Sequence, residues 1–242
     1  MLADTASNTE ASPHASPAAA RRGQIIAQAL LDVGAVGVYD GEKPFIFTAG
    51  WASPVYIDIR RLISFLRLRR QITEFAAETL TEQAGLEAFD AVAGGETAGI
   101  PYAAWIAERL SLPMLYVRKK PKGFGRDARI EGHVAPGARV LLVEDLASDG
   151  GSKVSFADAL RTAECSVAHT FVVFFYDIFP GARGSMIEHG LTLHYLCTWW
   201  DVLAAMRADD WTNTDRLDDV HSFLRNPISW SAAHGGRGAE PV

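Results

Sequence analysis

One short stretch near the middle of the chain combines an apolar strand, two acids and a turn of mostly small residues. Residues 140–143 form an uninterrupted apolar run, which is typical of a buried strand in a parallel sheet. Glu144 and Asp145 follow at once, and the turn occupies positions 146–152. Apolar residues with helical spacing come next, at 154–161. We therefore expect a strand, a turn and a helix, with both carboxylates at the carboxyl end of the strand.

This arrangement is suited to binding a sugar phosphate. Open α/β sheets bind ligands beyond the carboxyl ends of their strands, and the N–H groups of a turn at a helix amino end favour a phosphate. The acids just upstream can accept hydrogen bonds from vicinal hydroxyls. A simple connection with a serine helix cap and two solvated acids is the alternative, but the order of the parts favours a ligand site. The turn is not a Walker-type phosphate loop, because its serine and lysine stand in the reverse order.

The composition of the 242 residues excludes several classes of protein. A net charge of −6 argues against a general nucleic-acid binder, and no apolar run is long enough to span a membrane. The hydrophobic content of 48% is ample for a core. Cys165 and Cys197 lack the spacing of metal ligands and indicate buried free thiols in a reducing compartment, so a cytoplasmic location is expected.

Strand-like and helix-like segments alternate along most of the chain. Helices are expected at 22–31, 67–82, 101–110, 154–161, 180–189, 202–206 and 215–224, and strands at 45–48, 54–58, 89–93, 114–117, 140–143, 169–176 and 191–196. This alternation predicts an α/β fold with a doubly wound parallel sheet flanked by helices, and the two early strand-like runs predict a small antiparallel element. Residues 21–228 are expected to form one domain, between a disordered tail at 1–20 and a loose tail at 229–242.

Two further segments are expected to place anion-binding groups at the same edge of the predicted sheet. Residues 94–99 contain three glycines between a strand and a helix, and glycines let a backbone approach an anion closely. A turn chosen for its geometry alone is an equal alternative there. Residues 118–132 are basic and lack periodicity, so they are expected to form a loop. The first cations of this loop could hold a diphosphate, and Gly123 and Gly125 would let it close over a ligand.

These motifs resemble those of a known family. The strand, the two acids and the turn resemble the signature of the type I phosphoribosyltransferases. Three segments narrow the resemblance to orotate phosphoribosyltransferases: 47–61 with its Ser-Pro element followed by an aromatic residue and an acid, 94–101 with Gly-Ile-Pro, and 118–132 with Arg-Lys-Lys-Pro-Lys. The resemblance covers roughly residues 22–200 and implies the type I phosphoribosyltransferase fold with a small N-terminal hood.

The resemblance implies transfer of a phosphoribosyl group from phosphoribosyl pyrophosphate to orotate, giving orotidine 5'-phosphate and pyrophosphate in de novo pyrimidine (UMP) biosynthesis. It implies that Glu144 and Asp145 bind the ribose hydroxyls and that Lys122 and Asp145 act in catalysis. Arg118, Lys119 and Lys122 would stabilise the leaving diphosphate, and Ser148 would also contact orotate. The 5-phosphate would be held by the turn that comprises Leu146, Ala147, Ser148, Asp149, Gly150, Gly151 and Ser152.

The resemblance also implies a cofactor and a partner subunit. Mg²⁺ would neutralise the pyrophosphate while held by substrate oxygens and water, with no protein side chain as a metal ligand. A homodimer is implied, in which the loop of one subunit serves the site of the other. No nucleic-acid or membrane partner is expected.

Four positions depart from the pattern of the family. Thr48 and Ala98 stand where members carry lysine, Phe124 stands where many carry histidine, and Arg183 is offset from an arginine that meets the orotate carboxylate. Loss of these cations would change how strongly the site binds pyrophosphate. The offset arginine would change which base the site accepts. A phosphoribosyltransferase for another nucleobase and a non-catalytic regulator that senses phosphoribosyl pyrophosphate are therefore the alternatives.

Overall fold

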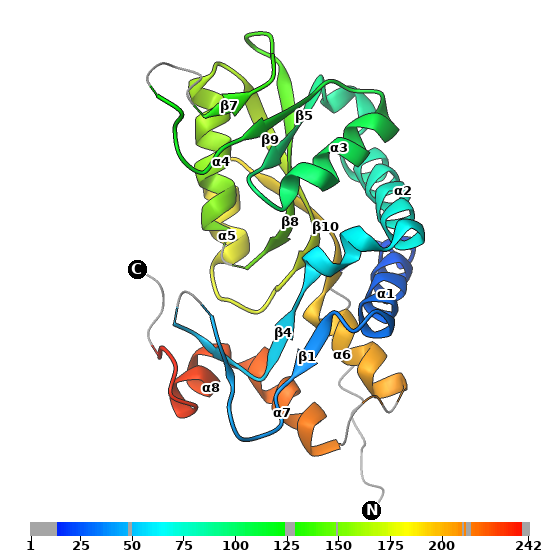
Figure 1. The fold of residues 1–242 in the computed structure, drawn as a ribbon, viewed down its shortest axis with the longest axis vertical. Coiled ribbons are helices and arrows are strands. Elements are labelled where there is room, and N and C mark those ends of the chain that lie inside the picture. Colours follow the sequence, from blue (N-terminus) through cyan, green and yellow to red (C-terminus); the bar gives the residue numbers. More distant parts are fainter. Residues whose placement is uncertain are drawn as a thin grey trace, which may run out of the picture.

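A six-stranded, mostly parallel sheet forms the centre of the molecule. The computed structural model describes residues 14–47, 50–123, 129–148, 150–209, 211 and 214–238. The strands run in the order β10-β9-β8-β5-β6-β7, and β7 is antiparallel to its neighbour (Figure 1). Their bounds are β5 (Ala91–Gly95), β6 (Met114–Val117), β7 (Ile130–Glu131), β8 (Arg139–Ala147), β9 (Ser166–Phe175) and β10 (Thr192–Thr198). The predicted doubly wound sheet is confirmed.

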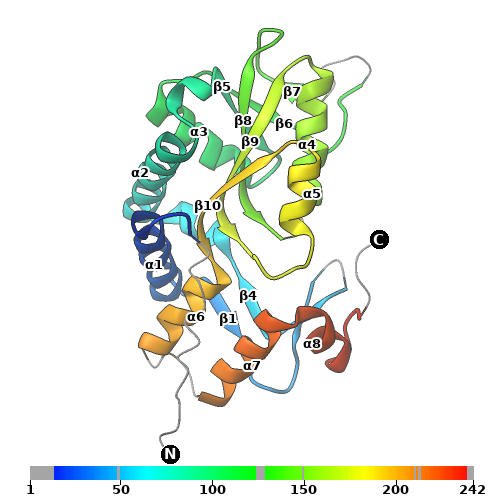
Figure 2. The same ribbon diagram turned by 180° about the vertical axis from the view of Figure 1, so that it is seen from behind.

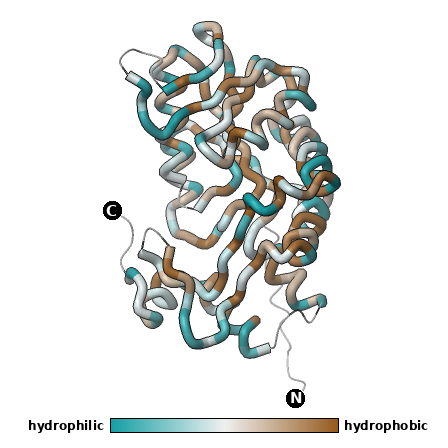
Figure 3. Tube along the Cα trace, viewed as in Figure 1, coloured by the Kyte–Doolittle hydropathy of each residue, from teal (hydrophilic) through white to brown (hydrophobic). Residues whose placement is uncertain are grey.

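Helices cover both faces of this sheet, and each face has its own core. Figures 1 and 2 show α1 (Pro17–Asp32), α2 (Leu66–Gln83) and α3 (Gly99–Leu110) along one face, and α4 (Gly151–Thr162) and α5 (Ala182–Glu188) along the other. Alternate residues of β8 enter the two cores: Leu141 and Val143 join one, and Val140 and Leu142 join the other. This alternation follows from the two-residue repeat of a strand. A strand buried on both faces has to be apolar throughout, and Figure 3 shows such apolar segments gathered in the interior.

A small hood packs over the carboxyl ends of the strands. We define the hood as residues 36–47 and 50–57, in which β1 (Val36–Val38) pairs with β4 (Val55–Ile57) and β2 (Phe45–Ile46) pairs with β3 (Ala52–Ser53). Aromatic rings join it to the end of β9: Phe47 lies 6.0 Å from Tyr176 between ring centroids. The two early strand-like runs therefore do not pair with each other, because the segment before them supplies β1 as a separate partner for β4. Two short 3-10 helices, η1 (Ile59–Ser64) and η2 (Leu86–Ala88), complete the connections.

Three helices end the described part of the chain, and the last of them extends the fold beyond its expected end at residue 228. These are α6 (Trp199–Ala208), α7 (Thr214–Arg225) and α8 (Pro227–Ala233), and none of the helices within the described ranges is long and apolar enough to cross a membrane. Trp230 is buried against Tyr39, and the hydroxyl of Ser231 accepts the N–H of Ala52 at 2.9 Å. The expected loose tail is therefore wrong for residues 229–238, because Trp230 gives this polar segment an apolar anchor on the hood.

The N-terminal boundary also differs from the expected one. Helix α1 begins at Pro17, and the Ser16 hydroxyl caps it by accepting the N–H of Ala19 at 3.1 Å. Nε2 of His14 lies 2.9 Å from the Asp201 carboxylate on α6. The expected disordered tail is therefore wrong for residues 14–20, because a Ser-Pro pair starts a helix despite the polar composition around it. Residues 1–13 lie outside the described part of the chain.

The basic segment after β6 contains one short strand that the sequence did not reveal. Ile130 and Glu131 form β7 by pairing with Val117 and Tyr116. The expected loop at 118–132 is therefore interrupted at its far end. Two paired residues are too few to show the alternation by which a strand is recognised in sequence.

Two histidines, buried His194 and half-buried His169, form a pair between β10 and β9. Nδ1 of His169 lies 3.0 Å from Nε2 of His194, whose own Nδ1 lies 2.7 Å from Oε1 of Gln83. His194 is 1% exposed, and burial lowers its pKa to about 4, with a smaller contribution from His169. The His194 ring is therefore neutral at pH 7 in the folded chain.

We expect this pair to make the fold sensitive to mild acid. The unfolded chain protonates His194 near its ordinary pKa of 6.5, whereas the folded chain resists until about pH 4, so stability is lost as the pH falls between those values. This difference in pKa corresponds to a loss of roughly 3 kcal/mol in the free energy of unfolding. Urea unfolding should show a smaller acid-induced loss for His194→Gln than for the wild type or for the exposed control His133→Gln. Equal losses in all three proteins would contradict this role.

Candidate active site

Three segments with polar chemistry meet at one edge of the sheet. The strands β8, β5 and β6 are parallel neighbours, so their carboxyl ends lie together. The strand β5 leads into the glycine turn and α3, β6 leads into the basic loop, and β8 leads into the second turn and α4. The neighbours of β5 on its two sides are reached by different connections, and such a switch point opens a crevice for a ligand.

Glu144 is buried at the centre of this edge. It is 7% exposed, and its Oε2 lies 3.3 Å from Nζ of Lys153 in the first turn of α4. Burial raises the pKa of the Glu144 carboxyl and the charge of Asp145 adds to the rise, whereas Lys153 and Lys119 oppose it. Two lysines therefore offset part of the cost of burying this charge.

Asp145 points to the opposite face of β8, as the alternation of a strand requires. It is also buried, and its Oδ2 lies 3.7 Å from Nε of Arg60, whose side chain is largely exposed. Burial raises the pKa of the nearby Tyr102 hydroxyl, and the Asp145 charge adds to that rise. The structure therefore brings both predicted acids to the strand end but gives them different surroundings, with a buried lysine beside Glu144 and an exposed arginine beside Asp145.

β5 continues through Gly94 and Gly95, and these glycines together with Gly99 at the start of α3 allow the neighbouring elements to pack closely. A Cβ on Gly95 would overlap the Glu144 carboxylate, and a Cβ on Gly99 would overlap the carbonyl of Val143. A Cβ on Gly94 would lie 2.8 Å from the Cα of Ile100. Close packing alone therefore requires these glycines, and their contact with a pyrophosphate stays a prediction.

The turn after β8 leads directly into α4. It is shorter than the expected turn at 146–152, because β8 continues through Leu146 and Ala147 and α4 begins at Gly151. Gly150 has a φ of +87°, in the left-handed region that favours glycine, and it precedes the first residue of the helix. The positive end of the helix dipole and the first N–H groups of α4 suit a phosphate at this point. The residues predicted to hold the phosphate are buried (Ala147, Gly150), half-buried (Leu146, Ser148) or exposed (Gly151, Ser152), and Asp149 lies outside the described residues.

Lys153 also lies in the site, although the sequence alone predicted no role for it. It is 4% exposed, it donates to the carbonyl of Leu146, and its Nζ lies 3.1 Å from Oγ of Ser152. A signal was present in the sequence, because Lys153 precedes Phe156 and Leu160 at helical spacing and so falls on the buried face of α4. A lysine on a buried face requires a partner.

The predicted loop cations are divided between two places. Nη1 of Arg118 and Nζ of Lys122 both lie near Oε1 of Glu131 on β7, at 3.3 and 3.5 Å. Lys119 instead donates its N–H to Oε2 of Glu96 at 2.7 Å, and its charge reaches the buried acid of β8. Of the three cations, the structure thus brings Lys119 to the acids of the same chain and holds the other two at the edge strand.

Arg129 holds the far end of the loop, and the sequence alone did not predict this role. Its Nε donates to the carbonyl of Arg118 at 2.8 Å, and its guanidinium lies 5.7 Å from the centre of the Phe156 ring on α4. The loop is thereby closed at its base onto the helix that follows the phosphate turn.

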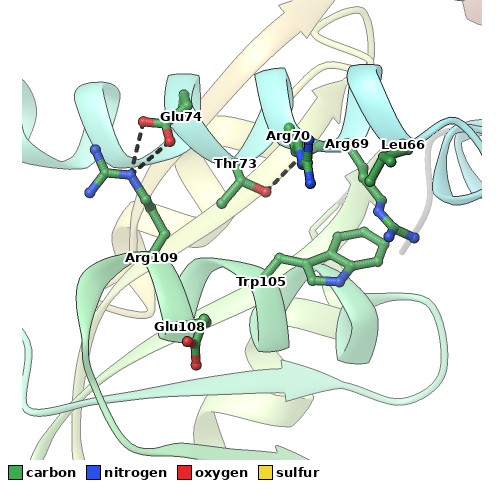
Figure 4. A pocket seen from close by; sticks show the side chains of 8 residues that line it. All are labelled: Leu66, Arg69, Arg70, Thr73, Glu74, Trp105, Glu108 and Arg109. Atoms are coloured by element: carbon green, nitrogen blue, oxygen red, sulfur yellow. Dashed lines mark hydrogen bonds and ion pairs between the residues drawn. The ribbon is translucent and has the colours of Figure 1, made fainter.

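Two hollows lie near this region. A cavity of about 220 Å³ beside the acids is lined by Arg60, Ile63, Thr97, Ala98, Pro101 and Tyr102. A groove of about 410 Å³ lies between α2 and α3, where Arg69 covers Trp105 and Arg109 pairs with Glu74 (Figure 4). The groove contains none of the predicted site residues, so we assign the site to the strand ends.

Comparison with known proteins decides between the families that such a site allows. An orotate phosphoribosyltransferase from a Ruegeria species is 54% identical over 222 residues, which cover 92% of this chain and 98% of that protein. The chain belongs to the orotate phosphoribosyltransferase family. Another orotate phosphoribosyltransferase, from Cereibacter sphaeroides, is 56% identical over 87% of this chain and 90% of its own. No protein-family model matches the chain.

Solved structures of similar proteins share the fold. The orotate phosphoribosyltransferase from Aeropyrum pernix is 30% identical, with a TM-score of 0.65 over 78% of this chain and 99% of that one. The UMP synthase of Leishmania donovani is 28% identical, with a TM-score of 0.71 over 84% of this chain and 42% of that one. The observed sheet and hood are therefore those of an orotate phosphoribosyltransferase.

The structure locates two of the four departures from the orotate phosphoribosyltransferase pattern. Ala98 lines the cavity beside Arg60. Arg183 pairs with both carboxylate oxygens of Asp177 at 2.7 Å and lies 3.1 Å from the Tyr195 hydroxyl, so a residue just after β9 and one on β10 hold its guanidinium. The other two positions, Thr48 and Phe124, lie outside the described residues.

We expect Gly95→Ala to destabilise the fold. The new methyl group would overlap the Glu144 carboxylate and contact the Phe156 ring, and overpacking of this kind costs about 1–3 kcal/mol. The matched control is Gly184→Ala on α5, where a Cβ meets nothing within 4 Å and alanine favours the helix. Denaturant unfolding should separate the two variants, and an unchanged midpoint for Gly95→Ala would contradict the packing argument.

Proposed function

We propose that this chain transfers the phosphoribosyl group of phosphoribosyl pyrophosphate to orotate, yielding orotidine 5'-phosphate and pyrophosphate in the synthesis of UMP. The observation that carries the proposal is the pair of buried acids, Glu144 and Asp145, at the carboxyl end of β8 between two glycine turns. The high identity to orotate phosphoribosyltransferases over nearly their whole length supports the same activity. The cytoplasmic location stays a prediction from the two free cysteines.

The substrate would lie across the strand ends with its phosphate at α4. The amino end of that helix would hold the 5-phosphate, through the turn at 146–152. Glu144 and Asp145 would accept hydrogen bonds from the ribose hydroxyls, because both are acceptors held beside that turn. The glycine turn after β5 would face the pyrophosphate, and Ser148 would also contact orotate.

The reaction breaks one bond to the anomeric carbon and forms another. A nitrogen of the orotate ring attacks this carbon while the bond to the pyrophosphate oxygen breaks, and the electron pair leaves with the pyrophosphate. Positive charge develops on the sugar, as in glycoside cleavage. The fixed carboxylate of Asp145 would stabilise that charge, and loop cations would stabilise the charge that leaves.

We further propose that the reaction uses Mg²⁺. Among the described residues, no group of three or more His, Cys, Asp or Glu side chains could hold a metal ion. The ion would be held by pyrophosphate oxygens and water, as Mg²⁺ commonly is. It would neutralise the pyrophosphate, and the Lys119 side chain would add to that effect.

The loop would serve the neighbouring subunit of a homodimer. Lys122 lies with Glu131 on the edge strand β7, and β5 and β6 separate that strand from the acids of β8. The loop starts after β6, next to that edge strand, and from there it could cross to a second copy. This geometry supports a site completed by two chains.

Consumption of orotate with phosphoribosyl pyrophosphate and Mg²⁺, followed by absorbance, tests the activity directly. Asp145→Asn should reduce the maximal rate about a hundredfold or more, because it removes a charge that stabilises the developing cation. The matched control is Glu74→Gln, which makes the same change on the exposed face of α2 and should leave the rate unchanged. A wild-type protein that consumes adenine or uracil but not orotate would overturn the proposal.

Lys122→Ala should lower the maximal rate far more than it weakens ground-state binding, because charge on the leaving pyrophosphate builds up in the transition state. If the loop crosses between subunits, a mixture of Lys122→Ala and Asp145→Asn chains forms hybrid dimers with one intact site. Its activity should exceed that of either parent. The control mixture of Asp145→Asn and Glu144→Gln should stay inactive, because both changes damage the same side of the site. No gain after verified subunit exchange would contradict a shared site.

A further inference from the structure

Lys153 occupies a position that is unusual for a lysine. It is 4% exposed, and lysine is almost never fully buried unless it is paired. Its Nζ lies 3.3 Å from Oε2 of Glu144 and 3.1 Å from Oγ of Ser152, and it donates to the carbonyl of Leu146. These three partners fill its three donor sites.

The partners of Lys153 belong to two functional parts of the site. Leu146 is the second-last residue of β8 and Ser152 is in the first turn of α4, so the two residues flank the turn that is proposed to hold the phosphate. Glu144 is one of the two acids proposed to bind the ribose. One ammonium group therefore joins both ends of the phosphate turn to a ribose acid.

The other oxygen of Glu144 faces the opposite side. Its Oε1 lies where a Cβ of Gly95 would be, and close to where a Cβ of Gly99 would be. The lysine thus holds one carboxylate oxygen, and the second is directed toward the glycine turn after β5. Each oxygen of the carboxylate therefore has its own neighbour, with Oε2 beside Lys153 and Oε1 beside Gly95 and Gly99.

We propose that Lys153 is a positioning residue of the transfer reaction, which keeps Glu144 charged and oriented toward the ribose and ties it to the phosphate turn. This inference rests on the proposed function, because it assigns a role within that same site. Lys153 itself touches Glu144 and the turn rather than the substrate.

The electrostatics of the site agree with this role. Burial raises the pKa of Glu144, and Asp145 on the same strand raises it further. The opposing cations are Lys153 from α4 and Lys119 from the loop after β6. Lys153 makes the direct contact, so its removal would leave a buried carboxyl with one exposed lysine to keep it ionised. A protonated carboxyl has less acceptor capacity for ribose hydroxyls.

Two neutral substitutions test the role of the charge. Lys153→Met removes the charge and all donors, whereas Lys153→Gln removes the charge but can still donate to the carbonyl of Leu146. The matched control is Arg22→Met, which removes a buried cation paired with Glu82 between α1 and α2, away from the site. If Lys153→Met does not fold, Lys153→Gln still tests the charge.

Calorimetric titration with ribose 5-phosphate and with inorganic phosphate, from about pH 5.5 to 8.5, gives the decisive readout. The preference for ribose 5-phosphate reports on the hydroxyls, because both ligands share the phosphate. In the lysine variants we expect this preference to disappear at low pH and to return as the pH rises, with a midpoint about one pH unit or more above that of the wild type. The acid limb of kcat/KM should move in the same direction. Arg22→Met should keep the wild-type profile even if it melts earlier.

Glu144→Gln identifies the group through which the lysine acts. In that background, Lys153→Gln should change the pH dependence no further, because the titrating carboxyl is gone. A lysine variant that folds and keeps the wild-type pH profile for both ligands would overturn the inference. An equal pH shift on Lys153→Gln in the wild-type and the Glu144→Gln background would also overturn the inference. The binding measurement needs neither orotate nor turnover, so a failure of the proposed activity would show separately, as a wild-type protein that binds ribose 5-phosphate but does not consume orotate.

Discussion

The close contact between the glycine turn after β5 and the end of β8 fixes the geometry of the whole site. Gly95 and Gly99 leave no room for a Cβ, because the Glu144 carboxylate and the backbone of Val143 occupy that space. The contact lets the start of α3 lie close to β8, and it places one oxygen of Glu144 beside Gly95 and Gly99. A larger residue in the turn would separate the two strand ends on which substrate binding is proposed to depend.

That contact buries the Glu144 carboxylate, and cationic side chains nearby offset the cost of burying its charge. Lys153 comes from α4 on one face of the sheet, and Arg60 approaches Asp145 from the segment after the hood on the other. The two acids are adjacent in sequence yet have separate cations. The two acids proposed to bind the ribose therefore have different electrostatic surroundings, although the charge of Asp145 still raises the pKa of Glu144.

The hood shows how distant parts of the chain close the fold around the site. Its strands pack on the end of β9 through Phe47 and Tyr176, and Trp230 from the last helix supports it from the other side. The N-terminal segment is tied to α6 through His14 and Asp201. Both chain ends therefore contribute to the body of the protein, although each looks like a tail in composition.

The sequence alone determined the parallel sheet, the alternation of its main strands and helices along the chain, and the presence of both acids at a strand end, because strand and helix periodicities are local. The order of the strands within the sheet came only from the tertiary structure. It also indicated the family through three separate motifs. It did not reveal β7, which is two residues long, or the role of residues 14–20 and 229–238, whose order comes from packing against distant elements. The buried lysine could be read only as a residue on a helix face. Only the tertiary structure decided that Lys153 meets Glu144 while Arg118 and Lys122 meet Glu131, because a charged side chain takes the partner that folding brings within reach.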